Sequence, residues 1–291
     1  MEFTPFFGIR DWRRILCLTS SGFRKASVIQ NRPDGDDRRQ RPRSDHRPRR
    51  QGGPTGGPRP QGRSNGDADS QRSGPRLPDD VEAKQLAPEV RRELTTLDKA
   101  TADFVAKHLV VAGNLLDEDP YAALEHARAA RGRASRIAGV REAVGLAAYR
   151  TGDWAQALSE LRAARRMGSK SPLLPVIADC ERGVGRPERA IELARTPEAE
   201  QLSGDDAEEL RIVVAGARCD LGQTEQALAF LSTPPLDTTR TGQTAARLFY
   251  VYADILLALE RRSEALQWFL HAAAADLEGA TDAEDRVAEL G

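Results

Sequence analysis

The chain has 291 residues, 40% of them hydrophobic, and a formal net charge of −1. Its charges are uneven, because residues 1–80 carry 17 Lys+Arg against 10 Asp+Glu, whereas residues 81–291 carry 26 against 34. No apolar run is long enough to span a bilayer. The three cysteines form no C-x-x-C and no zinc spacing, and such an odd, sparse set favours a reducing compartment. We therefore expect a cytoplasmic protein with no membrane partner.

Arginine dominates the cationic residues throughout the chain. Only five of the 43 cationic residues are lysine, and arginine predominates in both the basic and the acidic part of the chain. We interpret this bias as the codon usage of a GC-rich genome. Arginine content alone is therefore weak evidence for nucleic-acid binding.

The first 30 residues resemble neither the arm at residues 31–80 nor the body at residues 81–291. Arg13-Arg14 precede the short apolar stretch Ile15–Leu18. No small-residue cleavage site closes this stretch, which argues against a secretory signal. Two interpretations stay open: a short interfacial or docking helix, or a wrongly assigned start codon.

Residues 31–80 form an arm rich in Arg, Gly, Pro and Asp. Between residues 32 and 76 the only apolar residue is Ala68, so this segment is predicted to be disordered. Residues 32–76 carry 12 Arg against 6 Asp. Flexible basic tails bind phosphate through counterion release, which makes weak nonspecific nucleic-acid binding one hypothesis. A solubilising tail, or one that covers the acidic body, is the alternative.

Residues 81–291 are predicted to form an all-α domain. Pro88 suits the first turn of a helix, and three apolar residues follow on one stripe: Val90, Leu94 and Leu97. A second stripe runs from Phe104 to Leu116 and stops at Asp117–Pro120. No strand-like alternation of useful length is present.

An alanine followed by an aliphatic residue recurs through this domain, at Ala123-Leu124, Ala157-Leu158, Ala190-Ile191, Ala227-Leu228 and Ala265-Leu266. The alanine-to-alanine steps are 34, 33, 37 and 38 residues. Such a period is typical of stacked helical arrays rather than of a closed domain with an active site. Twelve residues before each alanine stands a residue that is small in four of the five cases: Val111, Gly145, Ala178, Ala215 and Ala253. Small residues let two helices cross closely, so each step predicts an antiparallel helix pair.

Residues 142–164 form the clearest unit. Gly145 and Ala157 are predicted to meet on the two helices of one pair. Gly152 is predicted to end the first helix in a left-handed conformation. Asp153 is predicted to cap the second helix, with Gln156 as its reciprocal partner.

This unit resembles the tetratricopeptide repeat, and the resemblance covers about residues 104–276. It implies a right-handed superhelical array of about five helix pairs, with an extra N-terminal helix and a C-terminal capping helix at 281–290. It also assigns the repeat's packing and turn positions: Gly145, Gly152, Trp154, Ala157, Leu161, Ala164, Ala190, Ala227 and Ala265.

The third and fourth units depart from the pattern. Pro197 and Pro234 stand where the second and fifth units have alanine. Proline ends a helix at about the preceding residue, so the second helices of these units are predicted to be short. Loops are expected at 198–206 and 235–243, either as tolerated insertions or as a distinctive binding surface.

No catalytic, cofactor-binding or metal-binding residue is predicted, and we expect no enzyme. The four histidines form no metal or catalytic spacing: His46, His108, His126 and His271. Cys180 and Cys219 fall among alanines on first helices and are predicted to be packing residues. No glycine-rich phosphate loop is present.

The resemblance implies a scaffold that binds a peptide or protein surface in a concave groove lined by first helices. The groove residues carried over are Glu142, Tyr149, Arg150, Asp179, Arg182, Arg247, Tyr250 and Asp254. Two alternatives stay open: an RNA- or ribosome-associated protein that uses the basic arm, or an accessory subunit of an enzyme or envelope assembly.

Overall fold

The computed structural model describes residues 74–291. The predictions for residues 1–30 and for most of the arm fall on residues 1–73, which lie outside the described residues. Within residues 74–291 the chain forms thirteen α-helices and two short 3-10 helices, with no strand, which confirms the all-α prediction. None of these helices combines the length and apolar character needed to cross a membrane.

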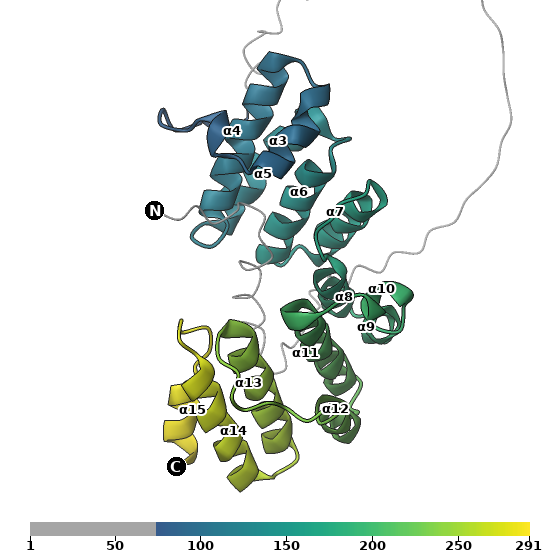
Figure 1. The fold of residues 1–291 in the computed structure, drawn as a ribbon, viewed down its shortest axis with the longest axis vertical. Coiled ribbons are helices and arrows are strands. Elements are labelled where there is room, and N and C mark those ends of the chain that lie inside the picture. Colours follow the sequence, from purple (N-terminus) through teal and green to yellow (C-terminus); the bar gives the residue numbers. More distant parts are fainter. Residues whose placement is uncertain (1–73) are drawn as a thin grey trace, which may run out of the picture. The chain divides into compact units, whose positions relative to one another are not determined.

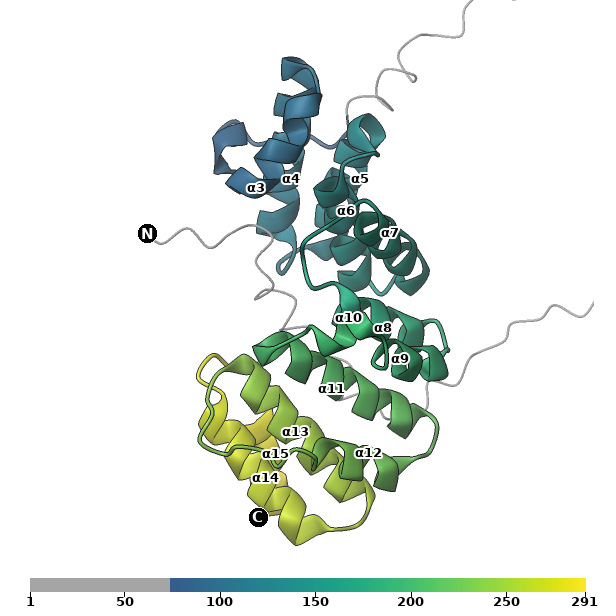
Figure 2. The same cartoon turned by 45° about the vertical axis from the view of Figure 1, so that its right-hand side comes forward.

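Five antiparallel helix pairs follow one another along the chain (Figures 1 and 2). In each pair the first helix packs against the second. The pairs are α4 (Lys99–Leu115) with α5 (Pro120–Ala134), α6 (Ala138–Arg150) with α7 (Trp154–Arg166), α8 (Leu174–Gly183) with α9 (Pro187–Leu193), α11 (Gly204–Asp220) with α12 (Thr224–Leu231), and α13 (Gln243–Ala258) with α14 (Arg262–Ala275).

Short elements flank these pairs. The predicted capping helix is present as α15 (Ala283–Leu290), which packs on α14. The extra N-terminal helix is present in three short pieces: η2 (Ala83–Gln85), α3 (Pro88–Glu93) and η3 (Leu94–Thr96). The predicted stripe of Val90, Leu94 and Leu97 therefore extends over a short helix, a 3-10 turn and the residue after it.

The turn of the clearest unit follows the predicted chemistry. Gly152 adopts a left-handed φ of 77°, and the Asp153 side chain accepts a hydrogen bond of 3.1 Å from the backbone N–H of Gln156. The prediction that Gln156 makes the reciprocal bond is wrong, because its Oε1 atom accepts a hydrogen bond from Arg128 of the preceding pair. Gln156 therefore joins two pairs instead of closing its own turn.

The closest contact at Gly145 is one helical turn beyond the predicted one. A Cβ atom added there would lie 2.6 Å from Cγ of Leu161, and Ala157 is not among its three nearest neighbours. Side chains on a helix lean toward its N-terminus. Leu161 therefore leans back toward the turn and covers Gly145, while Ala157 is fully buried beside it.

The proline-interrupted units have short second helices, as predicted. Helix α9 has 7 residues and α12 has 8. The loop after α12 is present, since α13 begins at Gln243. The predicted loop at 198–206 is wrong, because Pro197 starts the short helix α10 (Pro197–Glu200) and α11 begins at Gly204. Proline fits the first turn of a new helix as well as it ends an old one.

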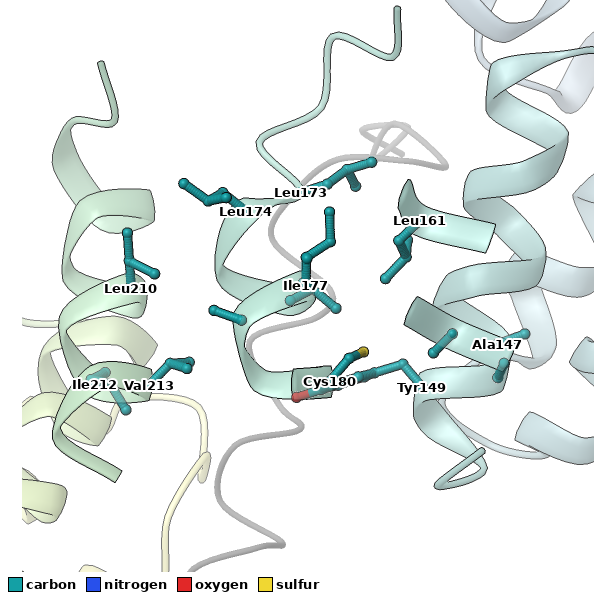
Figure 3. Packing of buried hydrophobic residues seen from close by; sticks show 14 of the residues in the cluster. Ala147, Tyr149, Leu161, Leu173, Leu174, Ile177, Cys180, Leu210, Ile212 and Val213 are labelled. Atoms are coloured by element: carbon teal, nitrogen blue, oxygen red, sulfur yellow. The ribbon is translucent and has the colours of Figure 1, made fainter. Parts of the chain in front are cut away.

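The core is continuous across neighbouring pairs. Figure 3 shows Ile177 of α8 between Leu161 of α7 and Leu210 of α11, and all three are buried. At the end of α8, Tyr149 of the preceding first helix reaches toward Cys180. Helix α8 therefore packs on α7 of the preceding pair and on α11 of the following pair, as well as on its own partner α9.

Candidate functional site

The predicted groove residues connect successive first helices through polar contacts, which we call the first-helix bridges. The Tyr149 hydroxyl of α6 donates to Asp179 of α8 at 2.5 Å. Arg182 of α8 donates to Asp179 at 2.9 Å and to Asp220 of α11 at 2.8 Å. A chain of hydrogen bonds therefore runs across three first helices.

Similar bridges join the remaining first helices. Arg150 lies 2.9 Å from Asp117, which follows α4. Arg247 of α13 pairs with Glu209 of α11, and both side chains are buried. Asp254 lies 3.4 Å from Arg286 of the capping helix. The bridges thus extend from the first pair to the cap.

Most of the predicted groove residues are buried. Five of the eight have relative exposures of 6% or less: Glu142, Tyr149, Asp179, Arg247 and Tyr250. The side chains of Arg150, Arg182 and Asp254 are 9%, 19% and 26% exposed. All eight residues therefore present little surface to a partner, and the buried five hold the helices together. Their role in binding stays a prediction.

Burial also sets the protonation of these groups. Burial, then the charge of Asp179, raises the pKa of Tyr149 well above its ordinary value, so its hydroxyl stays a donor. Burial raises the pKa of Glu142, and hydrogen bonds from Ser171 and Ser169 partly oppose this. Burial raises the pKa of Asp254 to about 6, against the opposing charge of Arg286.

An open pocket of about 510 Å³ lies where the first helices end. We call it the turn pocket; its lining includes Trp154, Asp179, Arg182, Gly183, Glu188 and Asp220. Two predicted groove residues, Asp179 and Arg182, therefore face an accessible space. Glu188, Asp220 and Trp154 as lining residues were not predicted from the sequence.

Two glycines allow close approach by residues that line this pocket. A Cβ atom at Gly183 would lie 2.5 Å from the Trp154 ring, so the ring packs against the end of α8. A Cβ atom at Gly216 would lie 2.6 Å from Cζ of Arg182. A glycine inside a helical pattern signals such close approaches in the sequence, but it does not name the residue that approaches.

Two histidines that look isolated in the sequence meet in the first pair. His108 and His126 lie with their Nδ1 atoms 3.0 Å apart, and both rings are buried. Burial, then the charges of His126 and Arg133, lowers the pKa of His108 to about 4, and burial lowers that of His126. Both imidazoles are therefore neutral at pH 7. Eighteen residues separate them, and no spacing rule predicts the pair.

The remaining candidates for chemistry are structural. No group of three or more metal-ligating side chains occurs within residues 74–291. Burial raises the pKa of Cys180 well above its ordinary value and that of Cys219 to about 11. Neither cysteine is therefore a thiolate nucleophile at neutral pH.

Stacked antiparallel helix pairs, with small residues at their crossings and no catalytic constellation among the described residues, define a helical-repeat protein. Residues 177–282 match the family model described as Tetratrico peptide repeat, so this part of the chain is a tetratricopeptide-repeat array. The match spans the third to fifth pairs, including both proline-interrupted units. The clearest unit, residues 142–164, precedes it. No curated protein matches the chain. A role in protein–protein interaction is general in this family.

Proposed function

We propose that the chain is a non-enzymatic scaffold that binds a peptide or protein segment where its first helices end. The turn pocket carries this proposal. It combines an aromatic ring, Trp154, with charged groups, and such residues dominate recognition of protein segments. A reducing, cytoplasmic setting is part of the proposal, since Cys180 and Cys219 are free.

The lining of the turn pocket favours a basic side chain. Three carboxylates, those of Asp179, Asp220 and Glu188, oppose one guanidinium, that of Arg182. Arg182 already contacts both aspartates. Glu188 is exposed and has no ion-pair partner among the described residues. It is the carboxylate best placed to pair with an incoming lysine or arginine.

Helix ends of both polarities lie at this pocket. Helices α8 and α11 end at Gly183 and Asp220, both in the pocket lining. The C-terminal end of a helix carries a partial negative charge that attracts cations. Helices α7 and α9 begin at Trp154 and Pro187, which also line the pocket, and their N-terminal ends carry the opposite partial charge, so the preference for a cation rests on the side chains.

Affinity capture with the full chain tests this proposal. We expect Glu188→Arg to lose proteins that the unaltered chain captures from a lysate of the source organism. Glu192→Arg is the matched control, because Glu192 is exposed on the same helix and lies outside the pocket lining. Equal capture by both variants would exclude the turn pocket. Capture that ribonuclease abolishes would favour the RNA-associated alternative.

A further inference from the structure

A second hollow lies outside the first-helix bridges, where η2, α3 and η3 meet the start of α4. It is open, has a volume of about 820 Å³, and we call it the α4 hollow. Its apolar lining comes from Leu94, Leu97, Ala102 and Ala106. Leu94 and Ala106 are buried and form its floor. An apolar side chain of leucine size is therefore a suitable occupant.

The rim of the α4 hollow is cationic. Arg91 and Lys99 line it, are exposed, and have no ion-pair partner among the described residues. The single carboxylate of the lining, Asp103, pairs with Lys107 at 3.0 Å. Helix α4 begins at Lys99, and the Asp98 carboxylate caps this end by accepting a 3.0 Å hydrogen bond from the backbone N–H of Thr101, so the positive charge of the rim comes from the two side chains. The hollow therefore suits an apolar side chain that is accompanied by carboxylates.

The loop between α14 and α15 presents such a group. Leu277 is 74% exposed, the highest value among the exposed large hydrophobic residues of residues 74–291, and Glu278 follows it. The Asp276 carboxylate accepts bonds from the backbone N–H groups of Ala280 and Thr281, at 2.7 and 2.6 Å. The loop is thus preorganised, which lowers the entropy lost on binding.

Charge complementarity extends beyond the two local features. Residues 81–176 carry 15 Lys+Arg against 12 Asp+Glu, whereas residues 177–291 carry 11 against 22. The hollow lies in the first range and the Leu277 loop in the second. Opposite charges on the two ranges favour contact between different copies of the chain.

We propose that the α4 hollow binds the Leu277 loop of a second copy of this chain, with Glu278 beside Arg91 and Lys99. The contact is heterologous, because each copy offers a hollow to one neighbour and a loop to another. It is separate from the turn pocket, so partner capture through Glu188 does not depend on it.

Sedimentation velocity of the full chain tests this contact. At about 50 mM salt we expect concentration-dependent association, which weakens at about 500 mM because screening shortens the reach of the charges. Leu277→Ser and Arg91→Glu should each weaken association about tenfold or more, through lost apolar burial or charge reversal. Leu270→Ser and Arg92→Glu are matched controls, because both residues are exposed and neither belongs to the hollow or the loop.

A mixing experiment separates this geometry from other modes of self-association. Each of the two test variants keeps one half of the contact. At a concentration at which each variant alone is monomeric, Leu277→Ser and Arg91→Glu chains should therefore form one-to-one heterodimers when mixed and no larger species. Circular dichroism checks that both variants are folded. A full chain that stays monomeric at low salt at every concentration overturns the proposal, and so does association that survives both variants.

Discussion

The guanidinium of Arg182 occupies the space in which a side chain at position 216 would lie. A Cβ atom added to Gly216 would be 2.6 Å from Cζ of Arg182. Arg182 belongs to α8 and Gly216 to α11, so the glycine lets a charged side chain of one first helix lie against the next. From there it reaches Asp220, one turn further along α11.

Replacing this glycine tests the relationship. Alanine is ordinarily favoured over glycine in a helix by about 1 kcal/mol. We nevertheless expect Gly216→Ala to lower the free energy of unfolding by about 1 kcal/mol, because Arg182 must leave its carboxylates. In an Arg182→Met background the same change should stabilise the chain. Urea unfolding of the unaltered chain, the two single variants and the double variant measures these free energies. An effect of Gly216→Ala with the same sign in both backgrounds would contradict the contact.

Gly145 gives a second test of close packing. Its added Cβ would lie 2.6 Å from Cγ of Leu161 and 3.2 Å from the Leu161 backbone nitrogen, which cannot rotate away. Gly145→Ala should therefore lower the free energy of unfolding by about 2 kcal/mol. Gly132 in α5 has no atom within 4 Å of its added Cβ, so Gly132→Ala should stabilise by up to about 1 kcal/mol. Chemical denaturation compares the two, and equal effects would exclude the register described for α6 and α7.

The buried pair of Arg247 and Glu209 joins α11 to α13, with side-chain exposures of 1% and 0%. Arg247→Met should lower the free energy of unfolding by about 3 kcal/mol or more, because it leaves a buried carboxylate without its cation. The double variant Arg247→Met, Glu209→Leu should recover most of this loss. Denaturant unfolding gives both values. A double variant as unstable as the single one would mean that the pair holds a specific geometry rather than balancing charge.

The fifth unit turns without the left-handed glycine that the second, third and fourth units use. Glu260 adopts a left-handed φ of 61°, a conformation that costs side-chain-bearing residues about 1–2 kcal/mol. Glu260→Gly should therefore raise the free energy of unfolding by about 1 kcal/mol, and thermal unfolding would show a midpoint a few degrees higher. Gly222 has a φ of 72° in the fourth unit, and Gly222→Ala should lower stability by a similar amount. A lower midpoint for Glu260→Gly would show that the glutamate contributes a compensating contact.

The His108 and His126 pair makes stability depend on pH. Folding lowers the pKa of His108 from 6.5 to about 4, so the unfolded chain binds more protons than the folded chain between these values. Stability should therefore fall as the pH drops from about 6.5 toward 4, and should be retained above 6.5. His108→Asn keeps a polar atom near the Nδ1 position and removes the titrating ring. Urea unfolding at several pH values should show a shallower loss of stability with falling pH for this variant. Identical pH slopes for the variant and the unaltered chain would exclude His108 as a source of the pH dependence.

Local chemistry explains which features the sequence predicted. Helix pairs, the Asp153 cap, the left-handed Gly152 and the short helices before Pro197 and Pro234 each depend on a few neighbouring residues. Their signals are periodicity, capping and backbone restriction, which act within one turn or one helix. Because the small residues recur along the chain, they also predicted that the helix pairs stack.

Contacts between helices explain what the sequence did not predict. Eighteen residues separate His108 from His126, and 38 separate Arg182 from Asp220. Gly145 meets Leu161 rather than Ala157 because side chains lean along their helix. Such pairings depend on the register and approach of two helices, which no local pattern encodes.

The predicted groove residues show most clearly the difference between what the sequence predicts and what depends on contacts between helices. Sequence by itself determined that Tyr149, Asp179, Arg182 and Arg247 lie on first helices of the repeats. Only the tertiary structure decided that most of these groups face one another and are buried, since that depends on the distance between adjacent helices. Small residues such as Gly216 bring the helices close enough for polar side chains to bridge them. A face expected to meet a partner thereby became, for the most part, the connection between repeats, and the turn pocket remained accessible.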